Sequence, residues 1–224
     1  FWRSPSPVAS QGVSVEEPLK GLDRLFKTDI APSRVAAIIV EPVQGEGGFN
    51  PVPPELMRAL RKVADEHGIV LIVDEIQTGF GRTGKLFAIQ NYDVKPDLMT
   101  MAKGLAGGFP LAAVTGRAGL MDAPLPGGPG GPFAGNPLAT AAGLATLGLA
   151  DDAVYATVAA RAREIGEIVG AALDAEGVAH RVQRSGSLFS VMFGAGAAQR
   201  GFADYRGAPA QGAGPLGPFF PPFL

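Results

Sequence analysis

Two ionisable residues, Asp74 and Lys103, each follow a short apolar run that is typical of a buried β-strand. Asp74 comes directly after residues 70–73, and Lys103 comes directly after residues 98–102. In an open α/β sheet, ligands bind outside the carboxyl ends of the strands. The spacing therefore predicts a carboxylate and an amine that converge on one ligand.

A carboxylate and a Lys amine in one site suit the cofactor pyridoxal phosphate. Its aldehyde needs a Lys for a Schiff base, and its pyridine nitrogen needs an acidic partner that keeps it protonated, so that the ring can accept electrons. Glycine-rich segments at 79–84 and 104–108 follow the two residues and allow tight turns beside such a ligand. The same pattern also has a structural interpretation, in which Asp74 caps a turn and Lys103 is a solvated strand end.

The surrounding pattern predicts the elements that would position these residues. Runs that are rich in β-branched residues or apolar throughout, typical of strands covered on both faces, occur at 36–40, 70–73, 98–102 and 112–115. Between the first two runs, Pro53 and Gly68 bound a helix with an apolar stripe. A strand, a helix and a strand in this order form a βαβ unit, which predicts a parallel sheet.

The later part of the chain predicts two helices and two strands. The helices are expected at 137–149 and 152–173, and the strands at 181–183 and 188–193. This order indicates the start of a smaller α+β domain. Residues 194–224 are rich in Gly and Pro, and we expect them to be irregular.

The composition excludes several classes of protein. The chain has 224 residues, and its 19 Lys and Arg against 21 Asp and Glu give a formal net charge of −2, which excludes a strongly basic nucleic-acid-binding domain. There is no Cys, so a disulfide scaffold and a thiolate zinc site are excluded. The chain shows no signal peptide and no continuous helical apolar segment of the ~20 residues that a membrane span needs. We therefore expect a cytoplasmic protein without a membrane or nucleic-acid partner.

Two further ligand classes are not predicted. Residues 79–84 fit a dinucleotide fingerprint, but four residues separate Asp74 from Gly79, and no periodic helix follows. His67 and His180 are too far apart in the sequence to indicate a metal site, so no metal is expected.

Four blocks of the sequence occur in the order and spacing of one enzyme family. They are residues 41–48 (EPVQGEGG), 73–84 (VDEIQTGFGRTG), 102–110 (AKGLAGGFP) and 134–137 (AGNP). Over about residues 1–150, the chain resembles the class III (omega) pyridoxal-phosphate aminotransferases, and most closely the 4-aminobutyrate aminotransferases. From Asn136 to about Phe193 it resembles the glutamate-1-semialdehyde aminomutases, most clearly at residues 184–189 (RSGSLF).

The resemblance implies a fold, a cofactor and partners. The fold would be α/β, with the mostly parallel sheet of a fold-type I pyridoxal-phosphate transferase large domain, here partial, followed by the start of a small α+β domain. The expected units are 1–150, 151–193 and the tail 194–224. The cofactor would be pyridoxal 5'-phosphate, the substrates amino and 2-oxo acids, and the assembly a homodimer with its site at the interface.

The resemblance also implies roles for individual residues. Lys103 would form the Schiff base and then carry a proton between the substrate carbon and the cofactor carbon. Asp74 would pair with the pyridinium nitrogen. Ile76 would pack against one face of the ring, and Gln77 would form a hydrogen bond near the phenolic oxygen of the cofactor.

Two acidic residues would face the substrate. Glu46 matches an acid that pairs with an Arg which otherwise grips a substrate carboxylate, and Glu41 matches an acid of the active-site wall. The resemblance thus implies transfer of a terminal amine, such as that of 4-aminobutyrate, onto a 2-oxo acid. The aminomutase is the alternative, and it would use the same Lys103 and Asp74 to return the amine to the neighbouring carbon.

The sequence departs from the family pattern, which leaves an inactive remnant as a third interpretation. Pro132 stands where the family has a Thr that reaches a cofactor phosphate, and proline offers neither a hydroxyl nor an N–H. The family's first half and its C-terminal carboxylate-binding Arg have no counterpart here. The chain is therefore expected to correspond to the middle and later part of a larger domain.

Overall fold

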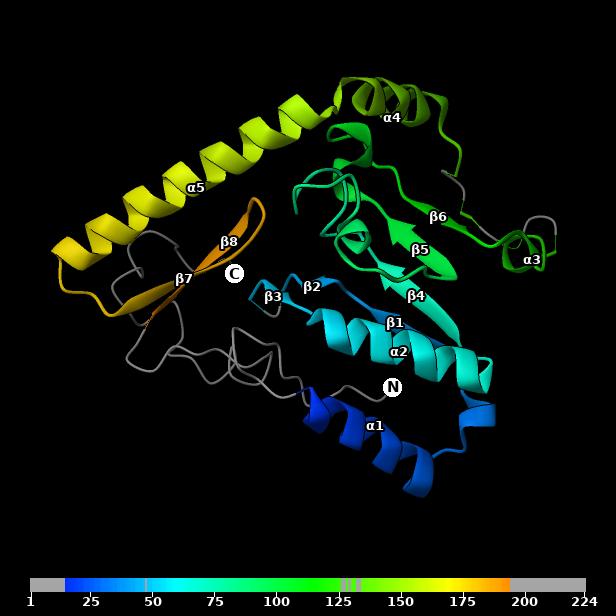
Figure 1. The fold of residues 1–224 in the computed structure, drawn as a ribbon. Helices are drawn as coiled ribbons and strands as arrows, with labels where there is room; N and C mark the ends of the chain where they lie inside the picture. The colour runs from blue at the N-terminus through cyan, green and yellow to red at the C-terminus, as the bar shows by residue number, and fades with distance from the viewer. Residues whose placement is uncertain (1–14, 47, 126–127, 129, 132–133, 194–224) are drawn as a thin grey trace, which may run out of the picture.

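The centre of the fold is a four-stranded sheet in the order β1-β4-β5-β6 (Figure 1). The structure is a computed structural model, and it describes residues 15–193 except 47, 126–127, 129 and 132–133. The strands of this sheet are β1 (Ala37–Val40), β4 (Val70–Asp74), β5 (Leu98–Met101) and β6 (Ala113–Gly116). β1, β4 and β5 are parallel, and β6 is antiparallel to β5, so the predicted mostly parallel sheet is confirmed.

Helix α2 (Pro54–His67) connects β1 and β4 and covers one face of the sheet (Figure 1). Pro54 has the fixed backbone angle that suits the first helical turn, and Gly68 ends the helix in the left-handed conformation at φ 66°. Met57 of α2 is fully buried, as is Val73 of β4 in the same core cluster. Burial of one such side chain contributes about 1.5–3 kcal/mol to the free energy of unfolding.

The opposite face of the sheet is more open at its edges. Ile39 of β1 is 58% exposed and Val114 of β6 is 50% exposed. The prediction that each strand is covered on both faces is therefore wrong for the edge strands within the described residues. Neighbouring side chains of β1 alternate between the faces, and Ile38 and Val40 are the ones that pack against the core.

Helix α1 (Glu16–Thr28) precedes the sheet and was not predicted from the sequence. Its Leu22 is buried, and its Phe26 packs against the cluster formed by Ala64, Ile69 and Leu71. A 3₁₀ turn, η1 (Pro32–Arg34), follows it. The spacing of the apolar residues after the acidic first turn is the sequence signal that could have predicted α1.

Four later elements agree with the predicted ones. They are α4 (Pro137–Leu149), α5 (Asp152–Ala175), β7 (His180–Ser185) and β8 (Leu188–Phe193). The short helix α3 (Ala118–Met121), which follows β6, was not predicted. The side chain of Asn136 accepts hydrogen bonds from the N–H groups of Leu138 (3.0 Å) and Ala139 (3.1 Å) and so caps α4. α5 contacts the antiparallel hairpin of β7 and β8 (Figure 1).

A two-stranded sheet of β2 (Val43–Gln44) and β3 (Asn50–Pro51) joins this hairpin to the main sheet. Gln183 Nε2 in β7 donates hydrogen bonds to the carbonyl oxygens of Gly48 (2.9 Å) and Phe49 (3.0 Å). Among the described helices, none is long and apolar enough to cross a membrane. The predicted irregular tail 194–224 and the departure at Pro132 lie outside the described residues.

Candidate active site at the carboxyl edge of the sheet

Asp74 and Lys103 lie at the same edge of the sheet, because β4 and β5 run in the same direction. The register pairs Asp74 with Thr100, and the N–H of Glu75 donates to the carbonyl of Thr100 at 2.9 Å. Lys103 begins the 3₁₀ turn η3 (Lys103–Ala106), which is separated from the end of β5 by one residue. The parallel topology therefore brings together the strand ends that carry the predicted carboxylate and amine.

Lys103 has an exposed side chain and an unusual backbone conformation. Its φ is +50°, in the left-handed region that residues other than glycine rarely adopt. Such a conformation costs about 1–3 kcal/mol and is found most often at functional sites. The amine of Lys103 donates a hydrogen bond to Oε1 of Gln77, so two residues that were predicted for the site are in direct contact.

Asp74 is half-buried, and one of its carboxylate oxygens stabilises the turn that follows β4. Its Oδ1 accepts a hydrogen bond from the N–H of Ile76 at 3.0 Å. Within the described residues, Oδ2 has no hydrogen-bond partner. On the neighbouring strand, the hydroxyl of Thr100 is buried and likewise has no partner among the described residues. This part of the edge therefore keeps unused hydrogen-bonding capacity, as a binding site for a polar ligand requires.

Glu75 is a structural residue of the site that sequence reasoning missed. Its side chain is fully buried. Its carboxylate accepts hydrogen bonds from the hydroxyl of Thr78 and from the N–H groups of Ala88 (3.0 Å) and Ile89 (2.7 Å). Ala88 begins the turn η2 (Ala88–Asn91), so Glu75 ties the far end of the glycine-rich loop back to β4. An acid directly after a strand and before a glycine-rich loop is the signal that could have found it.

Tyr92, which follows η2, fastens the loop after β1 to the site. Its hydroxyl contacts the carbonyl oxygens of Pro42 (3.0 Å) and Val52 (2.9 Å). Burial, together with the nearby Glu75 carboxylate, raises the pKa of Tyr92 to about 12. The hydroxyl therefore remains a hydrogen-bond donor over the whole neutral range.

The two predicted substrate residues lie in the loop after β1. Oε2 of Glu41 accepts a hydrogen bond from the N–H of Gly45 at 3.0 Å, which closes the loop on itself. A Cβ on Gly45 would come within 2.7 Å of Cγ of Gln77, so only glycine allows this close approach to the Lys103 partner. Glu46 is exposed, and its role stays a prediction.

A hollow of about 800 Å³ opens beside Lys103. Its lining includes Arg82 and the backbone of η3 and the segment after it, where Gly107 and Gly108 have φ of 59° and 111°. Asp74, Ile76 and Gln77 are not among the residues that line this hollow, so of the predicted site residues it reaches Lys103. The segment after Gly84 forms only the short turn η2, so the helix that a dinucleotide fingerprint needs does not follow it.

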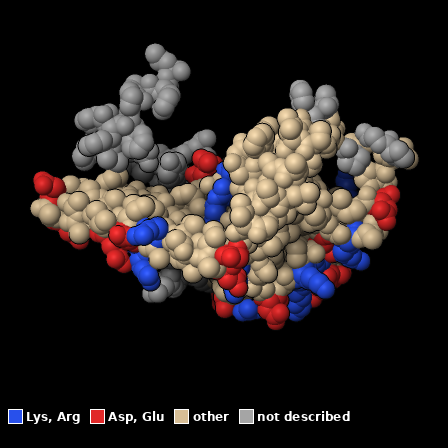
Figure 2. Space-filling view, turned by 90° about the horizontal axis from the view of Figure 1, so that it is seen from above, with Lys and Arg blue, Asp and Glu red and all other residues tan. Residues whose placement is uncertain are grey.

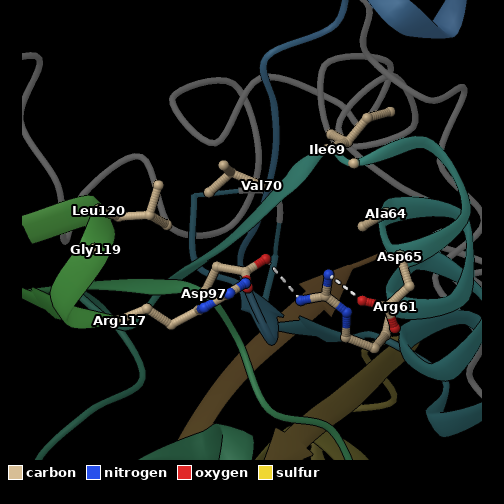
Figure 3. A pocket seen from close by; sticks show the side chains of 10 residues that line it. Arg61, Ala64, Asp65, Ile69, Val70, Asp97, Arg117, Gly119 and Leu120 are labelled. Carbon is tan, nitrogen blue, oxygen red and sulfur yellow. Dashed lines mark hydrogen bonds and ion pairs between the residues drawn. The ribbon is translucent and has the colours of Figure 1, made fainter. Parts of the chain in front are cut away.

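A second hollow, of about 460 Å³, lies at the opposite, amino edge of the sheet (Figure 3). Its charged side chains pair with one another. Arg61 of α2 contacts Asp97 and Asp65, each at 2.8 Å, and Arg117 contacts Asp97 at 2.9 Å. These charges compensate one another. The ion pairs around this hollow join α2, β5 and β6.

The fold is that of transaminases. An (S)-enantioselective omega-transaminase from Thermomicrobium roseum superposes with a TM-score of 0.71 at 30% identity, covering 87% of this chain and 44% of that one. Residues 6–208 match the aminotransferase class-III family, and the chain belongs to this family.

The most similar relatives include two bacterial enzymes. The chain is 54% identical over 147 residues to a 5-aminovalerate aminotransferase of Pseudomonas putida, covering 66% of this chain and 35% of the relative. It is 54% identical over 146 residues to the 4-aminobutyrate aminotransferase of Escherichia coli, covering 65% of this chain and 34% of the relative. The chain thus spans about a third of the length of these relatives.

The later residues also match an aminotransferase. A 5-aminovalerate aminotransferase of Pseudomonas aeruginosa is 44% identical over 182 residues, covering 81% of this chain and 42% of the relative. The relatives named here are all aminotransferases, so the aminomutase alternative is not favoured.

Proposed function

We propose that this chain forms the cofactor-binding part of a pyridoxal-phosphate-dependent aminotransferase that transfers a terminal amine to a 2-oxo acid. The observation that carries the proposal is the strained Lys103, whose amine contacts Gln77 at the edge of the sheet where Asp74 ends β4. The names of the relatives support an amine donor such as 4-aminobutyrate or 5-aminovalerate.

The unused polar groups of the site fit pyridoxal phosphate. The cofactor supplies an electron-accepting ring that stabilises negative charge on the substrate carbon. Lys103 would hold its aldehyde carbon, and Asp74 would hold its ring nitrogen with the oxygen that Ile76 leaves free. Gln77 would face its phenolic oxygen, and Ile76 would pack against the ring.

Lys103 also fits the role of proton carrier. An amine must lose its charge before it can act as a nucleophile or as a base. Once neutral, Nζ of Lys103 can accept a proton and return it, and the amide oxygen of Gln77 fixes the direction in which the amine points. Glu41 and Glu46 would form the substrate side of the site, which fits the position of their loop next to Gln77.

Borohydride trapping of the Lys103 adduct tests this function. The purified chain is mixed with pyridoxal phosphate and reduced, and the modified residue is located by mass spectrometry. We expect the adduct on Lys103, no adduct in Lys103→Ala, and an unchanged adduct in Lys85→Ala, which removes an exposed lysine directly after the glycine-rich segment 79–84. No adduct on Lys103 in the folded chain would refute the proposal and support the inactive remnant.

The choice of acceptor tests the reaction. With 4-aminobutyrate or 5-aminovalerate as donor, we expect 2-oxoglutarate to be consumed and glutamate to form. An aminomutase would leave 2-oxoglutarate unchanged. Turnover that proceeds without any 2-oxo acid would therefore contradict the aminotransferase assignment.

Self-association is the second part of the proposal. Apolar side chains are exposed on α4 and α5, among them Leu144 (74%) and Ile168 (63%). Figure 2 shows the molecule from the side of these helices, and its middle carries few charged side chains. α4 is apolar on all sides, so exposure of this helix to water is unfavourable. We propose that α4 and α5 pair with a second copy in a homodimer.

Sedimentation tests the homodimer. We expect Leu144→Glu to shift the chain from dimer to monomer, while the control Arg24→Glu, on an exposed position of α1 outside the proposed interface, remains a dimer. A monomeric wild-type chain would refute this part. The cytoplasmic location and the division into units 1–150, 151–193 and 194–224 belong to the same proposal.

A further inference from the structure

Arg82 is a cation of the Lys103 hollow that the proposed reaction does not yet use. Its side chain is half-buried, and its Nη1 is buried without a hydrogen-bond partner among the described residues. Burial lowers the pKa of its guanidinium. A buried donor without a partner costs free energy, so this nitrogen needs an explanation, and a ligand or water beside it is one.

The hollow has an uncompensated positive charge. Arg82 and Lys103 line it, and no acidic side chain does so in the described part of the chain. The hollow at the amino edge differs, because Arg61 and Arg117 are paired there with carboxylates (Figure 3). If Lys103 gives up its charge in the reaction, Arg82 remains as the permanent cation of the site.

The fold holds Arg82 in place through its backbone. The carbonyl of Arg82 accepts hydrogen bonds from the N–H of Ser187 (2.8 Å) and from its hydroxyl (2.9 Å), at the turn between β7 and β8. A Cβ on Gly104 would lie 3.6 Å and 3.7 Å from the two terminal nitrogens of Arg82. The guanidinium therefore lies against the residue that follows Lys103.

We propose that Arg82 binds the carboxylate of the amino acid or 2-oxo acid substrate beside Lys103. A planar guanidinium presents parallel N–H donors that match the two oxygens of a carboxylate. The inference rests on the proposed function and adds a residue that fixes the acidic end of the substrate. The cofactor phosphate offers the same oxyanion chemistry, and the experiment separates the two sources.

Calorimetric binding of glutarate tests the carboxylate site. Glutarate has carboxylates but neither an amine nor a keto group, so it cannot react at Lys103. We expect Arg82→Gln to raise the Kd of glutarate at least tenfold, and Arg82→Lys to raise it less. Arg58→Gln, which removes an exposed arginine of α2, should leave the Kd unchanged.

Two further measurements decide the remaining outcomes. If the phosphate is the anion, Arg82→Gln weakens the binding of pyridoxal phosphate but not that of pyridoxal, and the glutarate Kd does not change, which overturns the carboxylate assignment. If Arg82→Gln does not fold, protection of the native chain decides. Glutarate should then protect Arg82 from phenylglyoxal, as located by mass spectrometry, and an absence of protection overturns the inference.

The Lys103 adduct separates this inference from the proposed function. If borohydride traps no adduct on Lys103, the proposed function fails. If the adduct forms but glutarate binds wild type and Arg82→Gln within twofold of each other, only the role of Arg82 fails.

Discussion

Replacing Asp97 by Asn tests whether the amino edge of the sheet is held by buried charge. Asp97 precedes β5, and its side chain is 8% exposed. Its carboxylate accepts a hydrogen bond from the N–H of Leu71 (2.8 Å). It also accepts hydrogen bonds from Arg61 (2.8 Å) and Arg117 (2.9 Å), both of which lie beside it in Figure 3. Asp97→Asn keeps the shape and one acceptor oxygen, and it removes the charge.

The magnitude follows from the exposure of each partner. Arg61 is 17% exposed, and the loss of one member of a well-buried ion pair costs about 3–5 kcal/mol. Asp65 continues to pair with Arg61, which reduces this cost. Arg117 is 73% exposed, so its pair contributes at most about 1 kcal/mol. We expect Asp97→Asn to lower the free energy of unfolding by about 2–4 kcal/mol.

The effect should depend on pH in a definite direction. Burial by itself would raise the pKa of Asp97, but the hydrogen bonds from Leu71, Arg61 and Arg117 outweigh it and bring the pKa below its usual value of 3.8. The ionised carboxylate therefore stabilises the fold fully above the pKa of the unfolded chain, about 3.9. This contribution is lost as the pH falls through the lower pKa of the folded state.

Urea unfolding followed by circular dichroism measures the difference between wild type and variant at each pH. Asp65→Asn is the control, because Asp65 is 67% exposed and its loss should cost less than about 1 kcal/mol. Three results would refute the reasoning. They are a deficit for Asp97→Asn no larger than that of the control, a deficit that grows below the folded pKa, and a deficit that is the same at all pH values.

Three further substitutions have expected outcomes in the same unfolding assay. Glu75→Ala leaves two N–H groups and the Thr78 hydroxyl unpaired and should cost about 3–5 kcal/mol, whereas a loss below about 1 kcal/mol would contradict the anchoring role. Gly186→Ala places a Cβ 2.5 Å from Cα of Thr83 at a φ of 63° and should cost at least about 2 kcal/mol, so a neutral result would place the hairpin elsewhere. Asn136→Ala removes the cap of α4 and should cost about 1 kcal/mol, which an unchanged melting temperature would disprove.

The strand ends of the site could be predicted because their pattern is local. The apolar runs before Asp74 and Lys103 lie within two residues of the observed strands β4 and β5. A helix between β1 and β4 makes the connection a crossover, which requires parallel strands, and parallel strands end at one edge. Types and spacing of residues were therefore sufficient to bring a carboxylate and an amine to the same edge.

The supporting contacts could not be predicted, because they join residues that are distant in the sequence. The carboxylate of Glu75 has its partners at Ala88 and Ile89, and its burial depends on how the glycine-rich loop returns to the sheet. The carbonyl of Arg82 meets Ser187 only because the hairpin of β7 and β8 lies on that loop. The openness of β1 at Ile39 likewise depends on which elements pack against each face.

The sequence by itself determined the order of the elements, the parallel sheet and the residue types at the strand ends, because apolar periodicity and the βαβ connection are properties of a continuous stretch of chain. Only the tertiary structure decided that Lys103 adopts a left-handed conformation in contact with Gln77. It also decided that Nη1 of the half-buried Arg82 is left without a hydrogen-bond partner among the described residues. Both depend on loops from separate elements that meet in space, and a hydrogen bond exists only where the distance and direction between two groups allow it.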